Sequence, residues 1–174
     1  IEDEKRVMVT YEMAEGTSTT RSIEMLQELQ KRIQEIPAVY VAGGLAGLNI
    51  LTFSSKSNAG TVFVNLKHWD DRDLKTESVP KIIAEIQKRT ADIKEARILV
   101  VSPPAIPGLG QSSGFTFELQ QTTSTDDIRE FEGVLRKFLA AVNQRPEIAM
   151  AYSFFTARTP SYQIDVDKEK AKKL

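Results

Sequence analysis

The order of strand and helix patterns along the first hundred residues most limits the folds open to this chain. Apolar runs predict strands at residues 7–13, 38–42, 61–67 and 97–101. A first helix, with Thr17 or Ser18 as its N-cap, is predicted up to about Glu35 and is ended by Pro37; its apolar stripe is Ile23, Leu26, Leu29 or Gln30, Ile33 and Ile36. A second helix is predicted to start near Ser78, with Pro80 in its first turn. The order strand-helix-strand-strand-helix-strand is the ferredoxin-like βαββαβ arrangement (split βαβ), an α+β fold with an antiparallel sheet and two helices on one face.

The pattern then begins again after a loop rich in proline and glycine. Residues 10–13 and 116–119 align without gaps, and the hydroxyl-rich turns and helical stripes that follow stay in register. The second copy is predicted to hold a helix at 126–143 and strands at 115–119, 148–155 and 162–166, without a closing helix and strand. We therefore predict a complete unit over residues 1–110 and a truncated second copy over residues 111–174, with both ends of the chain cut from something longer.

Composition excludes several classes of function. The 23 basic and 24 acidic residues give a net charge of −1, so electrostatics offer no argument for binding nucleic acid or an anionic membrane. The chain has no cysteine and a single histidine, His68, which excludes disulfides, thiolate chemistry and a multi-histidine metal site. No apolar run approaches the length of a membrane span. We expect no catalytic residue, cofactor or metal, because no nucleophile has a base beside it.

Three phenylalanines are the candidate binding residues. Phe115 and Phe117 share one face of a predicted strand with Leu119, and Phe63 lies opposite the apolar face of its own strand. Ordinary core packing explains such residues, because aromatic side chains dominate cores. The alternative is the lining of a hydrophobic ligand pocket, where aromatic walls with few polar groups accept varied apolar molecules. Periodicity alone leaves both interpretations open.

The connection between the second and third strand patterns is the other candidate feature. Residues 43–49 hold three glycines, residues 54–60 are polar and loop-like, and residues 50–53 could extend a strand. This length is unusual for a simple hairpin, and long ordered loops are often functional. It is not a phosphate-binding loop, because no Gly-Lys-Ser/Thr sequence follows it.

Four short motifs occur in order along the chain. Residues 58–72 form a strand pattern that ends Leu-Lys-His-Trp-Asp-Asp-Arg, residues 104–110 contain Pro-Ala-Ile, residues 114–119 contain Phe-Thr-Phe-Glu-Leu, and residues 164–171 begin Ile-Asp-Val-Asp. Together these motifs resemble the periplasmic porter region of resistance-nodulation-division (RND) multidrug efflux transporters of the AcrB type. The resemblance covers nearly the whole chain. Each motif alone is a weak indication of the family, but four motifs in the same order are a specific one.

The resemblance implies that residues 1–110 are the first porter subdomain of the pump's second half and residues 111–174 the first part of the second porter subdomain. In that family the two subdomains flank a drug entry cleft, whose lining carries over to Phe63, Phe115, Phe117 and Leu119. A glycine-rich switch loop separates two drug pockets in the family. It corresponds here to Gly43, Gly44, Leu45, Gly47, Leu48, Asn49, Ile50, Leu51 and Phe53.

The implied location is the periplasmic portion of a Gram-negative inner-membrane protein that is driven by protons. The implied ligands are hydrophobic or amphiphilic drugs, and the implied partners of the full pump are two further copies in a homotrimer, a periplasmic adaptor protein and an outer-membrane channel. The main alternative is a stand-alone ferredoxin-like regulatory module that binds a small molecule, and a third is a small hydrolase or transferase. The pump hypothesis predicts a gene that continues into transmembrane helices.

Overall fold

The computed structural model describes residues 5–103, 115–122, 127–148 and 150–157. The chain divides into two compact units, Ile1–Phe117 and Glu118–Leu174. Each unit is described by itself.

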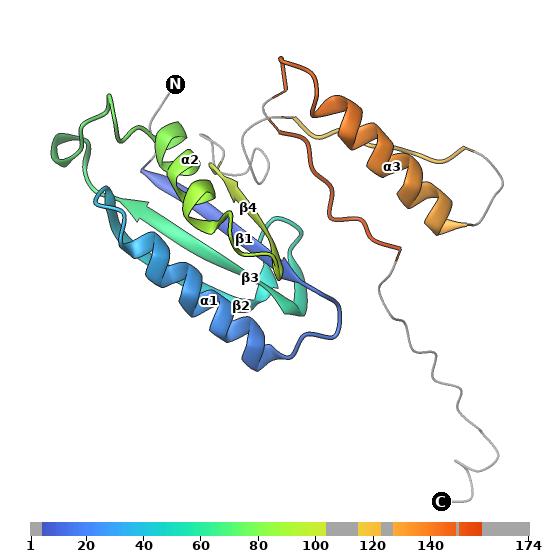
Figure 1. The fold of residues 1–174 in the computed structure, drawn as a ribbon, viewed down its shortest axis with the longest axis horizontal. Coiled ribbons are helices and arrows are strands. Elements are labelled where there is room, and N and C mark those ends of the chain that lie inside the picture. Colours follow the sequence, from blue (N-terminus) through green and yellow to red (C-terminus); the bar gives the residue numbers. More distant parts are fainter. Residues whose placement is uncertain (1–4, 104–114, 123–126, 149, 158–174) are drawn as a thin grey trace, which may run out of the picture. The chain divides into compact units, whose positions relative to one another are not determined.

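The first unit is a four-stranded sheet with two helices packed against one face (Figure 1). Its elements in chain order are β1 (Arg6–Met13), α1 (Thr19–Gln34), β2 (Val39–Asn49), β3 (Ser54–Leu66), the short 3-10 helix η1 (Trp69–Asp71), α2 (Val79–Thr90) and β4 (Ala96–Val101). The strand order is β2-β3-β1-β4, and every neighbouring pair is antiparallel. The predicted α+β fold with split βαβ connections is therefore confirmed.

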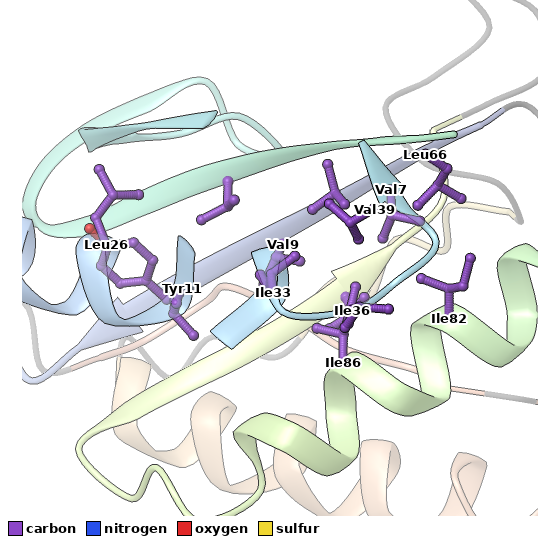
Figure 2. Close-up of a cluster of buried hydrophobic side chains, with 14 of the residues drawn as sticks. Val7, Val9, Tyr11, Leu26, Ile33, Ile36, Val39, Leu66, Ile82 and Ile86 are labelled. Carbon is purple, nitrogen blue, oxygen red and sulfur yellow. The ribbon is translucent and has the colours of Figure 1, made fainter. Parts of the chain in front are cut away.

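The hydrophobic core lies between the two helices and one face of the sheet (Figure 2). Val7, Val9 and Tyr11 of β1 point into it at the predicted period of two, and each is at most 1% exposed. Helix α1 contributes Leu29 and Ile33, so both helices need the sheet to bury their apolar stripes.

One position of the predicted stripe of α1 is wrong. The spacing placed Ile23 on the apolar face, but its side chain is 42% exposed and Ser22 is fully buried instead. The hydroxyl of Tyr11 donates a hydrogen bond to the Ser22 carbonyl (2.7 Å) and lies 3.0 Å from its Oγ. The Ser22 hydroxyl also donates to the Ala59 carbonyl (3.3 Å). The buried phenol is thus satisfied by the Ser22 carbonyl, and the buried serine hydroxyl is satisfied by Ala59. Burial raises the pKa of Tyr11.

The helix ends follow the predicted signals. Ser18 precedes α1, and its Oγ accepts a hydrogen bond from the Arg21 N–H (3.3 Å). Ser78 precedes α2, whose first turn holds Pro80. Gln34, the last residue of α1, caps the outer edge of β2: its Nε2 donates to the Tyr40 carbonyl (3.3 Å), and its Oε1 accepts from the Ala42 N–H (2.9 Å).

The glycine-rich connection is part of a hairpin, so the predicted loops at 43–49 and 54–60 are wrong. β2 continues to Asn49, β3 begins at Ser54, and the possible strand extension at 50–53 is the turn between them. Pairing with the neighbouring strand overrides the weak strand propensity of glycine and serine. Gly44 pairs with Val62, and a Cβ on Gly44 would lie 2.5 Å from the Thr61 carbonyl oxygen, so only glycine fits this close approach.

The second unit contains α3 (Ile128–Val142), which confirms the predicted helix. The Asp127 carboxylate caps it by accepting a hydrogen bond from the Arg129 N–H (2.9 Å). The Asn143 side chain exchanges two hydrogen bonds with the backbone of Ala151 (2.9 and 2.7 Å), which ties the segment after the helix back to its end.

The strands predicted at 115–119 and 148–155 are not formed in the described residues of these segments. A strand is stable only beside a hydrogen-bonded neighbour. The structure has no strand at residues 115–122 or 150–157, so alternation of apolar and polar residues was not a sufficient signal for a strand. The strand predicted at 162–166 and the helix start after it lie outside the described residues.

An ion-pair cluster ties α1 to α2. The Arg32 guanidinium lies 2.6 Å from Glu28 and 2.6 Å from Asp92, and it donates to the Arg89 carbonyl (2.9 Å). The hydrogen bond from Arg32 lowers the pKa of Asp92, which lies two residues beyond the end of α2.

Replacing Asp92 by asparagine should therefore destabilise the first unit at neutral pH and have no such effect in acid. A carboxylate whose pKa is lower in the folded state stabilises the fold above its unfolded pKa of about 4. This contribution is lost as the pH falls through the folded-state pKa. Urea unfolding of Asp92→Asn and of the parent at about pH 7 and about pH 2 measures the difference. Asp71→Asn, an exposed aspartate in η1, is the control; an equal loss in both variants would contradict the prediction.

Candidate functional site

The face of the sheet that carries no helix is the candidate site. Val62 and Val64 of β3 point into the core, so Thr61 and Phe63 project from the opposite face. Phe63 is partly buried there and is not a member of the core cluster. The core-packing interpretation of Phe63 is therefore wrong for this unit.

The neighbours of Phe63 on this face follow from the register. Met8 of β1 pairs with Phe63 on one side and Gly43 of β2 pairs with it on the other. A Cβ built on Gly43 meets no heavy atom within 4 Å. The surface beside Phe63 is therefore open at this glycine, and Leu45, two residues along the same strand, is 53% exposed.

The centre of the helix-free face is covered although no helix lies on it. Thr10 and Thr61 pair directly across β1 and β3 and are 1% and 0% exposed. The Thr61 hydroxyl donates to the Leu48 carbonyl (3.0 Å) and accepts from the Ile50 N–H (3.2 Å). Residues 48–55, which we call the hairpin tip, thus fold back onto the face from which Thr61 projects.

The fold of the hairpin tip has clear local causes. Ala46 pairs with Gly60 but Leu48 pairs with Ser55, so β3 carries extra residues and the hairpin bends at this bulge. Gly47 stands at the bend with φ +88°, a left-handed conformation that glycine adopts readily. Within the hairpin tip, Leu51 is buried, whereas Phe53 is 65% exposed.

The residues predicted as a switch loop therefore occupy two different environments. Gly43, Gly44, Leu45 and Gly47 belong to the body of β2 or to its bend. The remaining members form the hairpin tip or its turn: Leu48, Asn49, Ile50, Leu51 and Phe53.

The other predicted cleft residues lie outside the sheet. Phe115 is 80% exposed and Phe117 is 60% exposed, so neither is a core residue of the described chain. Both belong to the first unit, whereas the partly buried Leu119 belongs to the second. The shared face that their alternation predicted does not exist as a strand face, because no strand forms there.

A charge group on the helix-free face was missed from the sequence. The Glu12 carboxylate, whose side chain is 12% exposed, contacts Lys56 Nζ (2.8 Å) and the Arg97 guanidinium (3.1 Å). Two cations from different strands thus pair with this one carboxylate. The alternation of β1 places Glu12 on this face, but nothing in the sequence indicates that Lys56, just beyond the hairpin tip, reaches it.

The motif Leu-Lys-His-Trp-Asp-Asp-Arg has a structural role in this unit. Arg72 is 6% exposed, and its guanidinium donates to the carbonyls of Lys67 (3.0 Å) and Glu77 (2.9 Å), which fixes the connection from β3 to α2. Lys5 Nζ lies 4.4 Å from the centre of the Trp69 ring, a cation–π contact.

The described part of the chain holds neither a metal-binding cluster nor a membrane-spanning helix. No group of three or more His, Cys, Asp or Glu side chains is placed there to hold a metal ion. No helix among those residues is both long and apolar enough to cross a bilayer.

A family model described as the AcrB/AcrD/AcrF family matches residues 1–174. The chain therefore belongs to this family of RND efflux transporters, which confirms the resemblance seen in the four motifs. Because the match covers every residue of this chain, it also favours the transporter hypothesis over a stand-alone regulatory module.

Curated relatives agree with the family assignment. The chain is 25% identical over 174 residues to the solvent-resistant pump membrane transporter SrpB and 26% identical over 174 residues to the toluene efflux pump membrane transporter TtgE, both of Pseudomonas putida. Each alignment covers 99% of this chain and 16% of the relative. It is 29% identical over 124 residues to the multidrug resistance protein MdtF of Escherichia coli, covering 68% of this chain and 11% of that relative. The chain thus spans only 11–16% of the length of these relatives.

Proposed function

We propose that this chain is a periplasmic part of a proton-driven RND multidrug efflux pump and forms part of its drug entry cleft and binding pocket. The observation that carries the proposal is the helix-free face, where Phe63 stands beside the open position at Gly43. Exposed apolar side chains that gather on one face of a protein are typical of binding surfaces. Leu45 and Val41 project from β2 on the same face and are 53% and 42% exposed.

The charge distribution of this face suits apolar ligands of varied shape. The Glu12 carboxylate is paired with Lys56 and Arg97. The residues that flank Phe63 across the neighbouring strands are Met8, Val41 and Leu45, so a ligand beside Phe63 would meet apolar side chains. Binding then depends on buried apolar area, at about 25 cal/mol per Å², and not on a particular pattern of hydrogen bonds. Such a surface is expected to be polyspecific. Relatives named for solvents, toluene and multidrug resistance support hydrophobic or amphiphilic compounds as the ligand class.

The proposal also assigns the two parts of the chain. Residues 1–110 would be the first porter subdomain of the pump's second half, and residues 111–174 the first part of the second porter subdomain. In the whole pump, the cleft lining would be Phe63, Phe115, Phe117 and Leu119. The whole protein would act as a homotrimer with a periplasmic adaptor protein and an outer-membrane channel. We assign this chain no enzymatic role.

Substituting the proposed lining should lower drug resistance. The variants Phe63→Ala, Phe115→Ala and Phe117→Ala are made in the full-length pump, expressed in a Gram-negative host that lacks its own efflux pumps. We expect each to lower the minimum inhibitory concentration of some hydrophobic drugs by roughly 2- to 10-fold, since an aromatic contact is worth about 0.5–1.5 kcal/mol.

Leu74→Ala is the matched control, because Leu74 is an exposed apolar residue (48%) outside the proposed lining. The amount of each variant in the membrane is measured by immunoblot. Unchanged resistance to every compound at normal protein levels, or an equal loss in the Leu74 variant, would contradict the cleft assignment.

A further inference from the structure

We propose that the Thr61 hydroxyl is a latch that holds the hairpin tip against the helix-free face and thereby sets how much of that face is open around Phe63. Thr61 is a positioning residue in this proposal, because it acts through the hairpin tip and not by touching a ligand. The second half of the proposal rests on the proposed function, whereas the latch itself is a property of the fold.

The first argument is the position of the hydroxyl. Thr61 is 0% exposed, and its Oγ both donates to the Leu48 carbonyl (3.0 Å) and accepts from the Ile50 N–H (3.2 Å). One side chain therefore pairs two backbone groups on either side of Asn49. A buried backbone group without a partner is strongly disfavoured. Without the hydroxyl, the hairpin tip would have to leave the face for these groups to reach water.

The second argument is that further side-chain hydrogen bonds of the hairpin tip stay within it or at its bend. In the described chain, Asn49 Oδ1 accepts from the Leu51 N–H (3.0 Å), the Thr52 and Ser54 hydroxyls lie 2.6 Å apart, and the Ser55 hydroxyl donates to the Gly47 carbonyl (3.2 Å). These bonds would move with the hairpin tip. They keep it compact but do not hold it against the face.

The third argument is the hinge. Gly47 has φ +88°, and a Cβ built there meets no heavy atom within 4 Å. The register shifts between Ala46 and Leu48, so the strand pairing is interrupted at the same place. A bend with free space and interrupted pairing lets the hairpin tip pivot without disturbing the sheet.

The latch lies next to the proposed ligand surface. Phe63 follows Thr61 by two residues and projects from the same face, and Leu45 pairs with Thr61 across the strands. A latched hairpin tip therefore covers Thr61, the position next to Phe63 on this face. Releasing it uncovers that position and removes the contacts that a small ligand could make with the hairpin tip.

Thr61→Val and Thr61→Ser form a matched pair that tests the latch. Valine has the same shape without the hydroxyl, and serine keeps the hydroxyl. Amide hydrogen exchange is followed by NMR on the 174-residue chain. We expect the Ile50 amide to exchange about tenfold faster in Thr61→Val, as loss of one hydrogen bond implies. The amide of Val9 in the core should be unchanged, and Thr61→Ser should resemble the parent.

Two results would overturn the latch: an unchanged Ile50 amide in Thr61→Val, or equal acceleration at Ile50 and Val9, which would indicate general destabilisation. Thr61→Ala, which also removes the hydroxyl, provides a second approach if the valine variant does not fold. It should accelerate exchange at Ile50 more than at Val9, and an unchanged Ile50 amide there would also count against the latch.

Resistance of cells carrying the full-length pump tests the consequence for ligands. Thr61→Val should lower the minimum inhibitory concentration of small apolar compounds such as toluene by roughly threefold or more relative to that of bulky drugs, because only small ligands depend on contacts with the hairpin tip. Thr61→Ser should leave this ratio unchanged. A released latch with an unchanged ratio would overturn the role in ligand access. If Phe63→Ala also leaves all resistance intact, the proposed function fails while the latch measured by exchange stands.

Discussion

Gly60→Ala should destabilise the first unit by about 3 kcal/mol, the upper part of the range for overpacking a core. A Cβ on Gly60 would lie 2.5 Å from Cζ and 2.6 Å from Cε1 of Tyr11. The ring cannot move away easily, because it is 1% exposed and its hydroxyl is bonded to Ser22 (2.7 Å). Either the ring gives up that hydrogen bond or β1 and β3 separate.

Gly43→Ala is the control for this prediction, since it makes the same change in the neighbouring strand, where a Cβ meets nothing within 4 Å. Urea unfolding is followed by the fluorescence of Trp69, the one tryptophan of the sequence, which lies in the first unit. The cost of Gly60→Ala should also shrink in a Tyr11→Leu background, because the clashing ring atoms are gone. Equal stability of the two glycine variants would show that the close approach of Gly60 to Tyr11 is not a constraint.

Leu29→Ala should cost about 2–5 kcal/mol, because a fully buried leucine leaves both lost burial and a cavity. Leu29 is 0% exposed between α1 and the sheet. Ile23→Ala, on the same helix but at a position that is 42% exposed, should cost less than about 1 kcal/mol. Both are measured by the same unfolding experiment. Similar losses for the two variants would mean that the helix buries a different face from the one described.

The βαββαβ fold was predictable because its signals are local. The alternation of Val7, Val9 and Tyr11 sets the inner face of β1, and Ser18 and Ser78 mark where the two helices begin. The prediction for α1 was wrong at one position, where Ser22 and not Ile23 is buried, and the reason is a set of contacts with residues far away in sequence. The buried Ser22 hydroxyl lies 3.0 Å from the Tyr11 hydroxyl and donates to the Ala59 carbonyl (3.3 Å), and helical spacing cannot reveal such distant partners.

The hairpin was misread for a related reason. Glycine and serine runs indicate loops when propensity is considered alone, but pairing with β3 keeps the chain extended from Gly43 to Ala46, up to the bend at Gly47. Conversely, Phe115 and Phe117 alternate as a strand would, yet no described strand pairs with them. In both cases the presence or absence of a neighbouring strand decided whether a strand formed. A neighbouring strand that is far away in sequence leaves no local pattern.

The candidate site was predictable only in part. Resemblance pointed to the correct family, and the alternation of β3 placed Phe63 away from the core. The role of Thr61 could not be anticipated, because it depends on where the bend at Gly47 directs the hairpin tip. Phe115, Phe117 and Leu119 remain predicted lining residues that the resistance measurements address.

The Gln34 side chain at the end of α1 has a consequence for self-association. Its carboxamide occupies the Tyr40 carbonyl and the Ala42 N–H, the backbone groups that an added strand would need at this end of β2. An exposed sheet edge is a template for intermolecular pairing, and natural proteins protect such edges. Here the protection comes from one amide that imitates a neighbouring strand, so a long glycine-containing edge strand is shielded from growing into an intermolecular sheet at the end next to α1.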